Sequence, residues 1–181
     1  MFMSLVQKRR SIRKYRNTGV EEEKIDRLVE AALRAPSSRG KQSWEFVVVT
    51  DPAVLEKLSR ARPHGSAFLK DAALGIVVCA DPQKTDVWVE DASIASIFIH
   101  LAAASLDLGS CWIQVRQRDH DDTQSAENYI SGVLGLPSHI KVQSMIAVGH
   151  ADEAKSAHPK ESLPYEKVSL NRYGSPYPRR P

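Results

Sequence analysis

The chain has 181 residues, of which 42% are hydrophobic and 26% charged, a balance typical of one globular domain. A chain of this length can bury about 70% of the surface that it exposes when unfolded. The net charge of only +3 argues against a wholly basic, nucleic-acid-binding surface. The first residues, Met1 to Val6, have neither the pattern of a secretory signal nor that of a membrane span, so we expect a cytoplasmic protein with no membrane partner.

A basic segment precedes the first amphipathic pattern. Residues 7–15, QKRRSIRKY, carry five cations and a hydroxyl group. Guanidinium groups bind phosphate oxygens through paired, charge-assisted hydrogen bonds, so this composition indicates an anionic ligand. A solvated basic arm or a nucleic-acid patch is the alternative, and charge alone favours it over an anion-binding site.

The first predicted helix follows a turn at 17–19 and begins with the acidic residues 21–23. Its apolar residues recur at helical spacing: Ile25, Leu28, Val29, Ala32 and Leu33. The helix ends before Pro36, because the residue preceding a proline is disfavoured in helical conformation. Next we predict a strand over 45–50, a helix over 52–62 capped by Asp51, and a short helix over 66–71.

The apolar run 74–79 predicts a strand that is buried on both faces. The longest helix is expected over 87–106, where a stripe of small residues favours close packing, partly at a subunit interface. Gly109 is the expected cap at its C-terminal end. The remaining elements are a strand over 110–114, a loop over 116–122, a helix over 123–134 and a strand over 142–148.

Composition changes after Ala151. The last 30 residues contain five prolines and little apolar periodicity, which is typical of an extended arm and not of a second domain. An arm of this length needs a surface to lie on, so we expect residues 152–181 to wrap a partner subunit. A partly disordered tail is the alternative.

Four segments together resemble the nitroreductase family of flavin enzymes. They are residues 9–15, 35–46, 109–113 and 164–173, and the resemblance extends from about residue 5 to residue 173. It implies a single α+β domain over 1–181, with a mostly antiparallel central sheet flanked by helices. It also implies an intertwined homodimer with an extended C-terminal arm and FMN bound at the dimer interface.

The resemblance assigns the basic segment to the cofactor. Arg9, Arg10 and Ser11 stand at the positions that bind the FMN phosphate. Arg13 stands where the family places a cation near N1 and O2 of the flavin, where negative charge gathers on reduction. Lys160 is a further candidate for a phosphate contact, with a solvated lysine as the alternative.

Two other segments correspond to those that meet the flavin ring. A loop from the other subunit is implied to supply Pro36, Ser37, Ser38 and Gln42. In this loop Gly40 stands where the family often has asparagine, and Ser43 where it often has proline. The strand end Trp112, Ile113 and Gln114 is implied to direct the backbone N–H of Gln114 at N5, with Gln114 replacing the common glycine or glutamate.

The resulting hypothesis is an FMN-dependent oxidoreductase. NAD(P)H would reduce FMN, which then reduces a small-molecule acceptor such as a nitroaromatic or quinone, with no acid–base side chain required. A specialised flavin reaction, such as reductive dehalogenation or dehydrogenation, and a non-catalytic flavin- or nucleic-acid-binding protein are the alternatives. Neither the acidic run 119–122 nor the two separated cysteines has metal-ligand spacing, so no metal site is expected.

Overall fold

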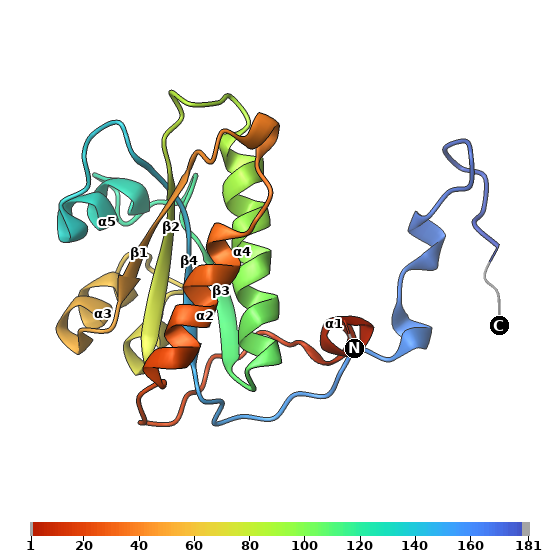
Figure 1. The fold of residues 1–181 in the computed structure, drawn as a ribbon, viewed down its shortest axis with the longest axis horizontal. Coiled ribbons are helices and arrows are strands. Elements are labelled where there is room, and N and C mark those ends of the chain that lie inside the picture. Colours follow the sequence, from red (N-terminus) through yellow and green to blue (C-terminus); the bar gives the residue numbers. More distant parts are fainter. Residues whose placement is uncertain (1, 179–181) are drawn as a thin grey trace.

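The computed structural model describes residues 2–178 and has a four-stranded sheet at its centre (Figure 1). The sheet consists of β1 (Trp44–Val49), β2 (Leu74–Ala80), β3 (Gly109–Gln114) and β4 (Lys141–Gly149). Its spatial order is β1-β2-β4-β3, and every neighbouring pair is antiparallel. The expected α+β class and antiparallel sheet are therefore confirmed.

Helices cover both faces of the sheet (Figure 1). The helices are α1 (Phe2–Lys8), α2 (Glu22–Leu33), α3 (Pro52–Ser59), α4 (Trp88–Ser105) and α5 (Ala126–Leu134), with short 3₁₀ turns η1 (Ser38–Gly40), η2 (Ala67–Asp71), η3 (Lys160–Ser162) and η4 (Tyr165–Lys167). Leu28 of α2 and Ile99 of α4 pack on one face, whereas Leu58 of α3 and Ile130 of α5 pack on the other. The strand β2 lies between two neighbours and is buried throughout, as its apolar run predicts.

Side-chain caps account for two helix starts. The Asp51 carboxylate accepts a hydrogen bond from the Ala53 N–H at 2.7 Å, and α3 begins at Pro52 as predicted. Ser125 accepts from the Asn128 N–H at 3.1 Å, so α5 begins three residues later than the predicted 123. The capping residue Ser125, and not Thr123 two positions upstream, therefore decides where α5 begins.

The prediction that Gly109 caps the C-terminal end of the longest helix is wrong. The helix α4 ends at Ser105, and Asp107 adopts the left-handed conformation with φ of 57°. Gly109 instead begins β3, where an added Cβ would lie 2.8 Å from Cγ2 of Ile12. The glycine therefore permits close approach of the basic segment to β3.

The helix α1 and the C-terminal arm both project from the sheet domain on the same side (Figure 1). The helix α1, which the sequence reasoning did not predict, begins the described chain. The C-terminal arm first runs beside the basic segment, where the Asp152 N–H donates to the Lys14 carbonyl at 2.9 Å, and then extends away. Residues 179–181 of the expected arm lie outside the described residues.

Candidate functional site

The basic segment lies against the outer edge of β3. Ser11 forms a parallel bridge with Ser110, and the Ile12 N–H donates to the Ser110 carbonyl at 3.0 Å. Beside this contact is a cavity of about 330 Å³, here called the basic hollow. The residues that line it are Ser4, Leu5, Lys8, Arg9, Arg10, Ile12, Ala104, Ser105, Asp107, Leu108, Gly109, Ser110, Ala151 and Lys155. Four of these are cations and one is an acid, so the hollow suits an anion.

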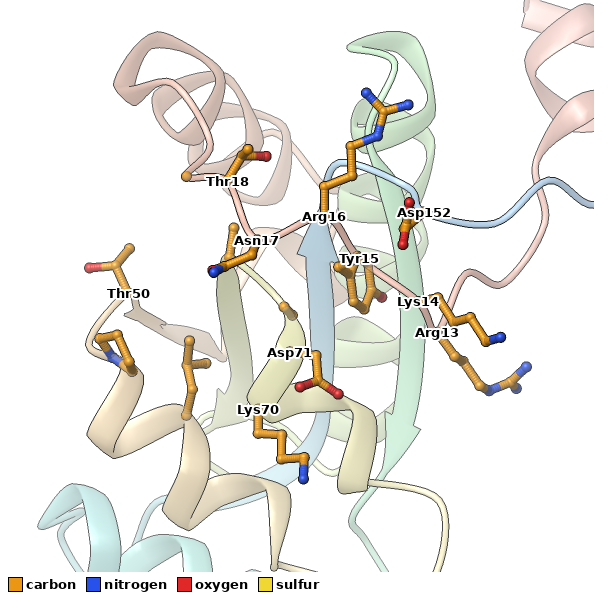
Figure 2. Close-up of a pocket in the computed structure, with 15 residues that line it drawn as sticks. Arg13, Lys14, Tyr15, Arg16, Asn17, Thr18, Thr50, Lys70, Asp71 and Asp152 are labelled. Atoms are coloured by element: carbon orange, nitrogen blue, oxygen red, sulfur yellow. The ribbon is translucent and has the colours of Figure 1, made fainter.

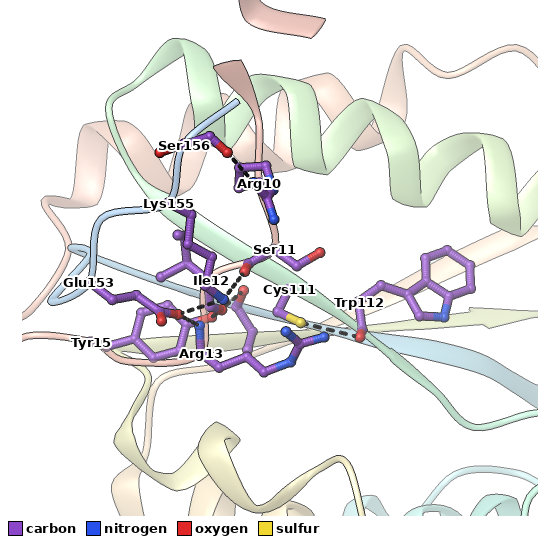
Figure 3. A network of polar contacts seen from close by, with 11 residues as sticks. Arg10, Ser11, Ile12, Arg13, Tyr15, Cys111, Trp112, Glu153, Lys155 and Ser156 are labelled. Atoms are coloured by element: carbon purple, nitrogen blue, oxygen red, sulfur yellow. Dashed lines mark hydrogen bonds and ion pairs between the residues drawn. The ribbon is translucent and has the colours of Figure 1, made fainter. Parts of the chain in front are cut away.

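Lys155, which the sequence reasoning missed, joins the predicted phosphate residues. Its ammonium group donates to the Ser11 carbonyl at 2.7 Å and lines the basic hollow (Figure 3). The Arg10 guanidinium donates to the Ser156 carbonyl in the same stretch of the arm. Lys160, the predicted contact in the arm, begins η3 and does not line the basic hollow. Nothing local in the sequence distinguishes Lys155 from Lys160 as the contact.

A buried histidine lies behind the bridge. The Nδ1 atom of His100 is 2.8 Å from the Ser110 hydroxyl oxygen. Burial, and secondly the nearby Arg9 cation, lower the pKa of His100 to about 4. His100 is therefore neutral at pH 7 and adds no charge to the basic hollow.

Apart from the bridge at Ser110, the outer edge of β3 pairs with no strand among the described residues, and it is here called the open edge. The Ser110 carbonyl faces this edge, where it accepts from Ile12, and so does the Gln114 carbonyl, which accepts from the Arg62 guanidinium at 3.2 Å. In an antiparallel ladder the N–H and C=O of one residue face the same side, and alternate residues face alternate sides. The N–H groups of Trp112 and Gln114 therefore face the open edge.

The Gln114 side chain fixes the end of this strand. It accepts a hydrogen bond from the Trp112 indole N–H at 3.1 Å and donates to the Arg116 carbonyl at 2.9 Å. Ile113 lies between Trp112 and Gln114 in the strand. Its side chain is buried in the core, and its backbone N–H and C=O face β4. Glutamine at position 114 thus has a structural role that glycine would lack.

The Arg13 side chain is exposed and extends along β3 beside Cys111 (Figure 3). Its guanidinium lies 5.8 Å from the centre of the Phe68 ring, and its backbone N–H donates to the Glu153 carboxylate at 2.6 Å. Burial raises the pKa of the Cys111 thiol, which makes this cysteine a weak nucleophile.

Arg13 also lines a second cavity, of about 730 Å³, which opens between the segment 13–19 and the chain that leads into β2 (Figure 2). With Arg13, the cations Lys14, Arg16 and Lys70 line it together with two acids, Asp71 and Asp152. The lining is therefore more mixed in charge than that of the basic hollow.

The loop that precedes β1 is held by a buried carboxylate. Asp91, 3% exposed in the first turn of α4, accepts from the Ser38 N–H at 2.8 Å and from the Ser43 hydroxyl at 3.1 Å. The Gln42 N–H donates to the Ser37 hydroxyl at 2.9 Å. Serine at position 43, where the family often has proline, therefore provides a hydrogen bond that proline cannot. Gly40 has φ of 65°, a conformation that asparagine also tolerates.

Within one chain this loop does not meet the basic hollow. The loop contacts α4 at Asp91, whereas the hollow contacts α4 at Ala104, about 20 Å further along the helix axis. The strands β1 and β3 also form opposite edges of the sheet. The structure thus brings Arg9, Arg10, Ser11 and the open edge of β3 together, and leaves residues 36–42 apart from them.

Residues 2–178 lack two other kinds of feature. They contain no cluster of three or more histidine, cysteine, aspartate or glutamate side chains arranged to hold a metal ion. None of their helices has the length and apolar character needed to cross a membrane.

Solved structures resemble this chain in fold and in sequence, and curated proteins resemble it in sequence. An FMN-dependent nitroreductase from Clostridium difficile R20291 superposes with a TM-score of 0.93 at 49% identity, covering 94% of this chain and 99% of its own. A curated Archaeoglobus fulgidus protein, provisionally named NADH dehydrogenase/NAD(P)H nitroreductase, is 37% identical over 84% of this chain and 87% of its own length. An FMN reductase [NAD(P)H] from Bacillus subtilis is 26% identical over 90% of this chain and 72% of its own.

The nitroreductase family profile matches residues 6–65 and 60–150. These matches include the basic segment, the loop before β1 and the open edge of β3. The match spans more than half of the chain, and the segments on which the resemblance rested all lie within it except the C-terminal one, residues 164–173. The chain therefore belongs to the nitroreductase family.

Proposed function

We propose that this protein is an FMN-dependent oxidoreductase that passes hydride from NAD(P)H to a small-molecule electron acceptor such as a nitroaromatic or quinone. The observation that carries the proposal is the open edge of β3, which has the cationic basic hollow at one end and the Gln114 N–H at the other. When bound, FMN supplies a ring that accepts and returns a hydride. The protein's own residues would bind and orient FMN and set how strongly its reduced form is favoured.

The phosphate end of FMN fits the basic hollow. Arg9, Arg10 and Lys155 present charge-assisted donors around one cavity, and Lys155 also donates to the Ser11 carbonyl. A phosphate carries about −1.5 to −2 charges at neutral pH, which this group of cations balances. Lys155 replaces Lys160 in this proposal as the arm's contribution.

The ring end fits the open edge of β3. The Gln114 N–H faces that edge and is proposed to meet N5 of the flavin, as the family resemblance implies. Arg13 extends along the same strand, so its charge favours a ring that gains negative charge on reduction. No side chain needs to transfer a proton for hydride transfer itself.

A homodimer is part of the proposal, because residues 36–42 reach the site only from a second copy of the chain. Exposed apolar side chains support this arrangement. On α4 these are Ile94, Ile97 and Phe98, which are 37%, 43% and 36% exposed, and others are Phe2, Met3 and Val6 of α1 and Leu163, Val168 and Leu170 of the arm. A second copy would cover a face of this kind. A reaction that consumes NAD(P)H also suits the expected cytoplasmic location.

The proposal is tested by a fluorimetric FMN titration together with NADH and NADPH oxidation assays in the presence of a quinone. The wild-type chain is expected to bind FMN and to oxidise one or both nucleotides only when FMN is present. The double variant Arg9→Ala/Arg10→Ala is expected to bind FMN at least 100-fold more weakly, because each charged hydrogen bond contributes about 1.5–3 kcal/mol. Arg27→Ala/Arg34→Ala, which breaks two exposed ion pairs on α2, is the matched control.

Wild-type protein that binds no FMN would contradict the proposal. Equal FMN affinity of the Arg9→Ala/Arg10→Ala variant and wild type would remove the basic hollow from the cofactor site.

A further inference from the structure

Arg62 makes a contact at the open edge of β3 that neither the family resemblance nor the sequence pattern indicates. Its side chain lies in the turn after α3, and its NH1 group donates to the Gln114 carbonyl at 3.2 Å across 52 positions of sequence. This carbonyl faces the same edge as the Gln114 N–H. The contact therefore holds the end of the strand on which the proposed N5 donor lies.

The turn that carries Arg62 is itself fixed. The Arg62 N–H donates to the Ser66 hydroxyl oxygen at 3.2 Å, and the buried Ser66 hydroxyl donates to the Ser59 carbonyl at 2.7 Å. Gly65, with φ of 88°, supplies the left-handed conformation of this turn, and an added Cβ there would lie at an ordinary van der Waals distance of 3.5 Å from NH1 of Arg62. Arg62 is half-buried, and its own turn lies against one side of the guanidinium.

No carboxylate within residues 2–178 forms an ion pair with Arg62, whose charged neighbour is the cation Arg118. Burial, and secondly Arg118, lower the pKa of Arg62, although a guanidinium remains charged at pH 7. A half-buried cation without a counter-ion is stabilised by an anion placed beside it. The end of β3 therefore favours a bound group that gains negative charge.

We propose that Arg62 is a positioning residue of the flavin site, which holds the Gln114 end of β3 and supplies a positive charge that favours reduced over oxidised FMN there. The inference rests on the proposed function, because it requires FMN at the open edge of β3. It adds a second cation to the site. Arg62, from the turn after α3, would favour reduced FMN together with Arg13 from the basic segment.

The test is a spectroelectrochemical titration of FMN-saturated wild type, Arg62→Gln and Arg62→Lys. The glutamine variant keeps an N–H donor but loses the charge, and is expected to lose about tenfold in its preference for reduced FMN, which lowers the midpoint potential by about 30 mV. The lysine variant keeps the charge and is expected to stay within threefold of wild type. Arg60→Gln is the control, because Arg60 lies two residues away in an exposed ion pair with Glu56.

An Arg62→Gln variant that binds FMN with an unchanged midpoint potential would overturn the inference and leave the proposed function intact. If this variant binds no FMN, the lysine variant decides: a wild-type midpoint supports the role of the charge, and a tenfold loss overturns it. Wild-type protein that binds no FMN would overturn the proposed function and this inference together.

Discussion

Asp91 ties the loop before β1 to α4 through two hydrogen bonds. Its carboxylate accepts one hydrogen bond from the Ser38 N–H and another from the Ser43 hydroxyl, and it is buried. No cation pairs with it among the described residues, so these two donors carry its stabilisation. The conformation of Ser37 and Ser38, which the family resemblance brings to the flavin, depends on this carboxylate.

Asp91→Ala is expected to lower the free energy of unfolding by about 1–3 kcal/mol, because it leaves a main-chain N–H and a hydroxyl without their acceptor. Urea unfolding followed by circular dichroism measures this loss. Glu90→Ala, an exposed acid in the same turn of α4, is the control and is expected to change stability little. A loss in Asp91→Ala no larger than that in the control would show that the loop is held by other contacts.

His100 makes stability depend on pH. Its pKa is about 4 in the folded state and about 6.5 in the unfolded chain, so the unfolded chain binds the proton at higher pH. The stability that neutral His100 contributes to the folded state is fully present above about pH 6.5 and is lost as the pH falls toward 4. The difference in pKa corresponds to roughly 3 kcal/mol across that window.

Urea unfolding at a series of pH values between 7 and 4 tests this dependence. The His100→Gln variant is expected to lose less stability than wild type over that range, whereas the exposed His64→Gln variant is expected to follow wild type. Parallel pH profiles of wild type and His100→Gln would mean that other groups carry the acid sensitivity.

At the scale of elements, the sequence predicted where each strand lies to within about one residue. Strand β2, for example, is an apolar run that ends before Asp81-Pro82. Helix boundaries were less accurate, because a serine cap decides where α5 begins. The helix α1 was missed because residues 2–8 have no acidic first turn and bury no residue. The expectation of an antiparallel sheet came from the family resemblance, and the order of its strands was not predicted, since local pattern does not specify pairing.

The candidate site was only partly predictable for a related reason. Arg9 and Arg10 occur in one basic run, so composition alone points to them. Lys155, Asp91 and Arg62 act through partners 144, 53 and 52 positions away, and no local pattern records contacts over such separations. The roles of Gln114 and Ser43 likewise depend on neighbours that only the folded chain supplies.

The C-terminal arm has two parts with different expected effects. Residues 152–156 contact the basic segment and include Lys155, whereas the remainder extends away from the sheet. A chain ending at Ser156 is therefore expected to keep its phosphate contacts but to dimerise more weakly. A chain ending at Ala151 also loses the Lys155 charge. We therefore expect it to bind FMN at least about tenfold more weakly than the chain that ends at Ser156.

Sedimentation velocity and fluorimetric FMN titration of both truncated chains measure these effects separately. A full-length chain that sediments as a monomer with FMN bound would contradict the dimer. Equal FMN affinity of the two truncated chains would exclude Lys155 from the phosphate site.

At the scale of the whole molecule, the fold presents one open strand edge with cations at one end and a main-chain donor at the other. The chemistry proposed for this edge needs a second copy of the chain to complete it, and exposed apolar side chains on α1, α4 and the arm are available to meet that copy. Proteins named as flavin reductases and as nitroreductases are both among the relatives of this chain, so family membership alone does not specify the acceptor.

The most direct test of the central claim is the anaerobic absorbance spectrum of the FMN-loaded protein during addition of NADH or NADPH. The protein is expected to bind FMN in a stoichiometric amount, to lose its yellow flavin absorbance when one nucleotide is added, and to regain it when a quinone or nitroaromatic follows. Bound FMN that keeps its absorbance with both nucleotides would contradict an NAD(P)H-dependent flavin oxidoreductase.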